Sequence, residues 1–97
     1  MGEAWAVKVR YTRRALRQIA DILDYIEARS PQGAANVKRR LQAVFDLLAN
    51  YPEAGRATNK RDVRHVVVSP YPYMIFYRSN AAEVVVLGVR HTARRPL

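Results

Sequence analysis

A chain of 97 residues, 49% of them apolar, suits one domain with a modest core and is too apolar to stay disordered. It contains no cysteine, which excludes disulfides, thiolate catalysis and the usual structural zinc sites. It also contains no run of about 18 apolar residues, which excludes a membrane span. The net charge of +9 predicts an acidic partner, either nucleic acid or protein. With no secretory pattern at its start, the chain is expected to be cytoplasmic.

The first predicted element is a strand over residues 5–11. Its apolar side chains alternate with small or charged ones, which is the period of a half-buried strand: Trp5, Val7, Val9 and Tyr11.

A first amphipathic helix is predicted over residues 13–28, with Thr12 as its N-cap. The spacing of its apolar residues places them on one face: Ala15, Leu16, Ile19, Ala20, Ile22, Leu23 and Ile26.

A second amphipathic helix is predicted to begin at Ser30 and Pro31, a capping residue followed by a residue suited to the first turn. Its apolar stripe is Ala34, Val37, Leu41, Val44, Phe45 and Leu48. Asn50, Pro52 and Gly55 end it. Because the link between the two helices is short, we expect them to fold back as a hairpin.

The second half of the chain predicts a polar loop over residues 53–62 and then three strands. The strand segments are "RHVVVS" (64–69), "PYMIFYR" (72–78) and "EVVVLGVR" (83–90). Short connections between them imply an antiparallel meander. The predicted fold is therefore α+β: an N-terminal strand, a helical hairpin and a three-stranded antiparallel meander, in a single domain over residues 1–97.

Gly88 interrupts the last predicted strand, and a lone glycine in a strand often marks a bulge. Simple alternation places His91 on one face with Val85, Leu87 and Val89. A bulge at Gly88 would reverse that assignment, so both faces stay open for His91.

The segment "GVRHTARRP" near the end of the chain sets His91 among Arg90, Arg94 and Arg95. Such a cluster suits two different functions. It could cleave RNA, with the histidine moving a proton and the arginines holding phosphate. It could equally be a basic tail that docks onto a partner.

Four segments together resemble the RelE/ParE superfamily of bacterial toxins: "ALRQIADILDYIEARSP", "LLANYPEAGR", "VRHVVVSPYPYMIFYR" and "VVVLGVRHTARRP". The resemblance covers nearly the whole chain and is closer to the ParE branch. It implies a toxin of a type II toxin–antitoxin system that poisons DNA gyrase and forms a hetero-oligomer with a ParD-like antitoxin. Composition and periodicity alone indicate only a basic α+β domain.

The nuclease branch of the superfamily cuts mRNA on the ribosome, and this sequence carries only part of what that resemblance requires. Candidates are His91 as acid or base, Arg64 or Arg94 as phosphate clamp, and Tyr73 as donor. Ser69 stands where those nucleases carry an arginine. Ribosome-dependent mRNA cleavage is therefore the alternative function, and no catalytic residue is assigned.

The residues expected to contact the target or partner are Arg64, Tyr73, His91, Arg94 and Arg95. No metal or cofactor is expected, because His65 and His91 are the only histidines and no carboxylate stands at ligand spacing from them. The C-terminal basic segment is the leading candidate for the toxic determinant.

Overall fold

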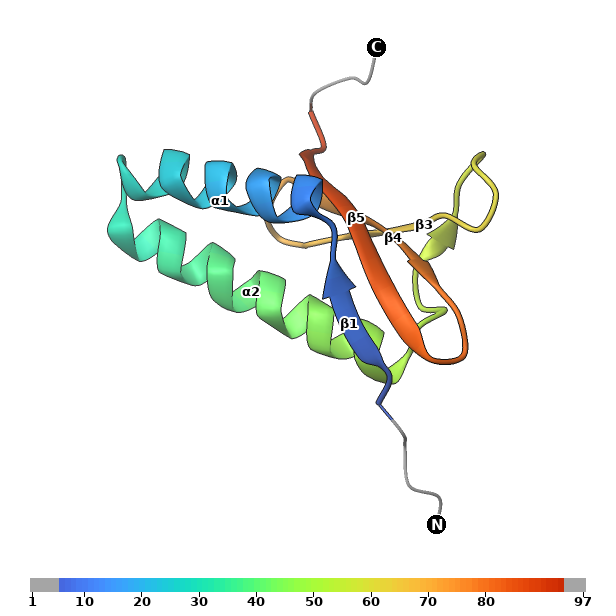
Figure 1. Ribbon diagram of the computed structural model, residues 1–97. Helices are drawn as coiled ribbons and strands as arrows, with labels where there is room; N and C mark the ends of the chain where they lie inside the picture. The colour runs from blue at the N-terminus through green and yellow to red at the C-terminus, as the bar shows by residue number, and fades with distance from the viewer. Residues whose placement is uncertain (1–5, 94–97) are drawn as a thin grey trace.

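The structure is a computed structural model that describes residues 6–93 (Figure 1). A hairpin of two helices lies on one face of a five-stranded sheet, which confirms the predicted α+β fold. The elements in chain order are β1 (Lys8–Tyr11), α1 (Arg13–Glu27), α2 (Pro31–Asn50), β2 (Arg56–Ala57), β3 (Arg64–Val67), β4 (Tyr73–Ser79) and β5 (Glu83–His91).

The strands lie in the order β1-β5-β4-β3-β2. Strands β3, β4 and β5 form the predicted antiparallel meander, and β1 adds to β5 in parallel. The two-residue strand β2, which pairs with β3, lies within the segment predicted to be a loop. Two residues are too short to carry a periodic signal, so the sequence could not predict this strand.

Both helices begin at the predicted caps. The Thr12 hydroxyl accepts a hydrogen bond from the Ala15 amide at 3.0 Å, and Ser30 accepts one from Gly33 at 3.0 Å. The predicted apolar stripe of α2 is buried throughout. The predicted face of α1 is too wide, because Leu16 is 53% exposed and Ala20 is exposed as well. Helix α1 packs through a narrower stripe, and these two residues fall on its flank.

The core lies between the helices and the sheet face that carries Ile75, Tyr77, Val84 and Val86, which are fully buried. Within the described residues the helices lie over β1 and β5 and do not approach β2 or β3. Figure 1 shows the hairpin extending to one side of the sheet, while the β2–β3 turn lies on the other side. Neither helix in residues 6–93 is long and apolar enough to cross a membrane.

Candidate functional site

Tyr73 and His91, both predicted as contact residues, form a pair at one end of the sheet. Tyr73 begins β4 and lies directly opposite His91, which ends β5. Their ring centroids are 5.4 Å apart and the ring planes are 86° apart, an edge-to-face arrangement. Tyr73 is only 9% exposed and His91 is half-buried, so the histidine is the more accessible member of the pair.

A bulge decides on which face His91 lies. Phe76 pairs with Gly88 but Tyr77 pairs with Val86, which leaves Leu87 without an opposite residue. The bulge therefore sets Val89 and His91 on the helix-covered face, the face that Val84 and Val86 share before it. The alternation that grouped His91 with Val85 and Leu87 is wrong for this reason.

Helix α1 passes close to β5 at Gly88. A Cβ atom on Gly88 would lie 2.9 Å from the side-chain oxygen of Gln18. That oxygen accepts a hydrogen bond from the Val89 amide at 2.8 Å. Gln18 thus satisfies an edge of β5 that β1 does not reach, and sequence reasoning missed this role because a glutamine in a helix carries no distinctive signal.

The hydrogen bonds of the pair restrict its chemistry. The Nδ1 atom of His91 accepts from the Ala93 amide at 3.1 Å, which leaves Nε2 as the donor atom. The Thr92 amide donates to the Pro72 carbonyl at 2.8 Å and holds the turn that follows β5 against β4. Burial, with a smaller contribution from Tyr25, raises the pKa of Tyr73, so its phenol stays a hydrogen-bond donor near neutral pH.

Arg64, the third predicted contact residue, lies away from this pair. It pairs with Tyr77, four residues along β4 from Tyr73, a separation of about 13 Å along the strand. Its Nη1 atom donates to the Gly55 carbonyl at 2.8 Å, and the Gly55 amide donates to the Tyr77 hydroxyl at 2.8 Å. Arg64 thus anchors the loop after α2 and lines a hollow of about 480 Å³ beside the β2–β3 turn.

Arg94 and Arg95 lie outside the described residues. The structure places the end of β5, from which they follow, beside Tyr73. It therefore brings together two of the five predicted contact residues and sets Arg64 apart from them.

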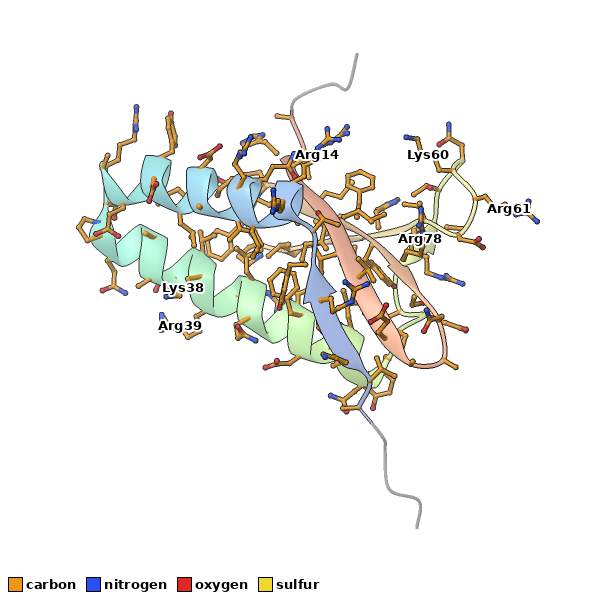
Figure 2. The ribbon with its side chains drawn as sticks, viewed as in Figure 1. Arg14, Lys38, Arg39, Lys60, Arg61 and Arg78 are labelled. Carbon is orange, nitrogen blue, oxygen red and sulfur yellow. The ribbon has the colours of Figure 1, made fainter. Side chains whose placement is uncertain are left out.

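The basic charge is distributed over several surfaces. Figure 2 shows Lys38 and Arg39 on α2, Lys60 and Arg61 on the β2–β3 turn, and Arg14 at the start of α1. Among residues 6–93 the only ion pair joins Arg10 and Glu83, at 2.8 Å. In the same part of the chain no three His, Asp or Glu side chains gather as metal ligands could.

A small basic protein with a helical hairpin on one face of a sheet has the architecture of the RelE/ParE class of toxins. A chain of a solved structure titled "Chromosomal ParDE TA system from P. aeruginosa" shares this fold, with a TM-score of 0.77 and 19% identity. The match covers 89% of this chain and 96% of that one.

Residues 9–96 match the family described as "ParE toxin of type II toxin-antitoxin system, parDE", and the chain belongs to that family. It is 39% identical to "Putative toxin Y4kP" of Sinorhizobium fredii over 87% of this chain and 86% of that protein. It is 40% identical to "Toxin RelE2" of Caulobacter vibrioides over 90% of this chain and 97% of that protein. The protein is therefore a toxin of a ParDE-type toxin–antitoxin system, and such a system implies an antitoxin partner.

Proposed function

We propose that this toxin inhibits DNA gyrase by binding it, without a catalytic step of its own. The observation that supports the proposal is the separation of Arg64, one of the two candidate phosphate clamps, from Tyr73 and His91. Arg64 is about 13 Å along β4 from Tyr73 and His91, and its guanidinium is engaged by the Gly55 carbonyl. A phosphate held by Arg64 would be out of reach of His91, because proton transfer needs hydrogen-bond contact.

The proposed contact surface is the end of the sheet at which β4 begins and β5 ends. His91 presents its Nε2 donor there, without a hydrogen-bond partner among residues 6–93, and its ring lies against the buried ring of Tyr73. Arg94 and Arg95 follow Ala93 directly in the sequence and supply positive charge for an acidic surface of the target. Arg64, which fixes the loop that follows α2, lies outside this surface.

The proposed partner is a ParD-like antitoxin that holds the toxin in a cytoplasmic hetero-oligomer. Charge supports this partner, since the chain carries 17 Lys and Arg against 8 Asp and Glu. A basic toxin favours an acidic, amphipathic antitoxin segment that folds on binding.

The alternative function is cleavage of mRNA on the ribosome. Two observations favour it: the histidine and tyrosine of the predicted nuclease set lie in contact, and one relative bears the name RelE2. Against it, Arg64, one of the two candidate phosphate clamps, lies about 13 Å along β4 from this pair.

The test applies the purified toxin to two parallel assays, supercoiling and DNA cleavage by gyrase, and mRNA cleavage on translating ribosomes. We expect inhibited gyrase and intact mRNA. A double variant, Arg94→Ala with Arg95→Ala, should lose gyrase inhibition. The matched control, Lys38→Ala with Arg39→Ala, removes the same charge from α2 and should keep it. If the unaltered toxin cleaves mRNA and His91→Ala does not, the toxin is a nuclease and the proposal is overturned.

A further inference from the structure

One side of α1 carries apolar residues that the fold of the single chain leaves uncovered. Leu16 is 53% exposed, Ala20 is exposed, and Leu23 is half-buried. These residues recur at intervals of four and three, so they lie in one line along the helix. Four charged residues border this line, and all are exposed: Arg13, Arg17, Asp24 and Glu27. We refer to these seven residues as the outer face of α1.

The charges of the outer face are arranged against the stability of an isolated helix. The amino end of a helix favours carboxylates and the carboxyl end favours cations. Helix α1 has the reverse order, because its first turn has no acidic residue and its last turn has no basic one. Like charges are also neighbours, since Arg17 follows Arg13 by four residues and Glu27 follows Asp24 by three. Among residues 6–93 none of these four side chains forms an ion pair.

The outer face is complementary to itself in the antiparallel direction. Ala20 lies at its middle, with Arg13 and Glu27 seven residues to either side, about 10 Å away at the rise of an α-helix. A two-fold axis at Ala20 therefore sets Arg13 against Glu27 of a second copy. The same axis sets Arg17 near Asp24 of that copy.

We propose that two copies of this toxin associate through the outer face of α1, as an antiparallel dimer with two-fold symmetry. The small side chain of Ala20 lets the two helices approach closely at the axis, and Leu16 of one copy packs beside Leu23 of the other. Each arginine also comes near the carboxyl end of the other helix, where a cation is favoured. The interface is separate from the proposed gyrase contact, because neither Tyr73 nor His91 lies on this face.

A second copy fits the outer face better than a nucleic acid or an acidic protein does. Asp24 and Glu27 would repel either of those partners over half of the face. Arg29 follows the helix but does not offset this repulsion, because its guanidinium lies 3.8 Å from the centre of the Tyr25 ring, on another side of α1. The face carries as many arginines as carboxylates, although the chain as a whole carries a net charge of +9. Contact through this face therefore brings opposite charges together, which contact between two basic surfaces would not.

The size of the outer face predicts a weak dimer. Helix α1 has 15 residues and is therefore about 22 Å long. A single pair of such helices buries less than the roughly 1,200 Å² at which stable complexes begin, and exposed ion pairs add little. We expect a Kd of about 10–100 µM at about 0.15 M salt, and weaker association in higher salt.

Sedimentation velocity of the full-length toxin, without antitoxin or gyrase, measures the dimer from about 1 µM to about 500 µM. Arg13→Glu with Arg17→Glu makes all the charges of the outer face negative. Asp24→Arg with Glu27→Arg makes them all positive. Each double variant should weaken self-association about tenfold or more, and an equimolar mixture of the two should associate at least as tightly as the unaltered toxin.

Two controls separate the interface from folding and from net charge. Both double variants place their new charges in favourable order along the helix dipole, so neither should lower the Tm. Lys38→Glu with Arg39→Glu on α2 changes the net charge as much as the arginine double variant does. This control should alter the Kd by less than about threefold.

Three results would overturn the inference. The first is an unaltered toxin that stays monomeric up to about 500 µM. The second is a dimer that both double variants keep, because the interface would then lie elsewhere. The third is a loss in each double variant that the mixture does not restore, because the outer face would then not pair with itself. None of these measurements involves gyrase or an antitoxin, so the function proposed above stands or fails separately.

Discussion

The two halves of the sheet are stabilised in different ways. Strands β1 and β5 lie under the helical hairpin, and the side chains between them are apolar and buried. Strands β2 and β3 have no helix over them within the described residues. Val66 and Val68 join the core, and hydrogen bonds at Gly55 also hold this half to β4. Burial dominates under the helices, whereas beyond them hydrogen bonds to backbone atoms add to a smaller amount of apolar burial.

Gly55 is the centre of the half without helices. Its amide donates to the Tyr77 hydroxyl and its carbonyl accepts from Arg64, so both of its backbone groups are satisfied by side chains. A Cβ atom here would lie 2.7 Å from both the Tyr77 oxygen and the His65 carbonyl. Further along, the Thr58 hydroxyl accepts from the Lys60 amide and closes the turn before β3. A polar segment thus becomes ordered without a core of its own.

The largest loss of stability is expected from a substitution in the helix-covered half. Leu48 of α2 is fully buried, so Leu48→Ala should lower the free energy of unfolding by about 2–5 kcal/mol, through lost burial and the cavity it leaves. Its neighbour Leu47 is exposed, and Leu47→Ala should change that free energy by less than about 0.5 kcal/mol. Urea titration of both variants measures the difference. Equal losses from the two would contradict the placement of the core.

A smaller effect is expected from the hydrogen-bonded half. Tyr77→Phe keeps the buried ring but removes the acceptor of the Gly55 amide, which should cost about 1–3 kcal/mol because a buried donor is left unpaired. Urea titration gives the size of the loss. Amide exchange should quicken at Gly55 more than under the helices, and equal acceleration in both halves would count against separate stabilisation.

The same contrast explains what the sequence could predict. Periodic apolar residues mark the helices and the long strands, so the buried stripe of α2 and the meander of β3, β4 and β5 follow directly. Caps such as Thr12 and Ser30 mark helix starts for a local reason, since the hydroxyl bonds to an amide three residues on. These features depend on neighbouring residues alone.

Long-range hydrogen bonds were not predictable in this way. Tyr77 and Gly55 are 22 residues apart, and nothing in the loop sequence indicates that an arginine and a tyrosine would share one glycine. The proposed contact residues also differ in how far the sequence could predict their positions. The pairing of Tyr73 with His91 depends on a bulge whose position Gly88 suggests, whereas the distance to Arg64 depends on the register of the whole sheet.

Gln18 tests whether polar groups also stabilise the helix-covered half, because its side chain makes a hydrogen bond there. Gln18→Ala removes the acceptor of the Val89 amide, and the loss should be about 0.5–1.5 kcal/mol, since this site is only partly buried and water can replace the side chain. Thermal melting of Gln18→Ala measures it. Gln42→Ala is the control, because Gln42 bonds only to exposed Asp46. A loss no greater than that of the control would show that β5 needs no support at this edge.

The smallest expected effect concerns the ion pair between Arg10 of β1 and Glu83 at the start of β5. Hydrogen bonding to Arg10 holds the pKa of Glu83 below its ordinary value of 4.5. A depressed pKa in the folded state means that this stability is present above the unfolded pKa and is lost as the pH falls through the folded one. The Tm of the unaltered protein should therefore exceed that of Glu83→Gln slightly at neutral pH, and the difference should shrink as the pH falls from 4.5 through the lower pKa that Glu83 has in the folded state.

Salt provides an independent check on that last prediction. Arg10 is more than half exposed, so about 1 M salt should screen the pair and reduce the Tm difference at neutral pH. A difference that persists in acid and in high salt would mean that the Glu83 side chain contributes through packing. The contact between β1 and the start of β5 would then be stabilised by packing, as the interior under the helices is. The contrast between apolar and polar stabilisation would not extend to this contact.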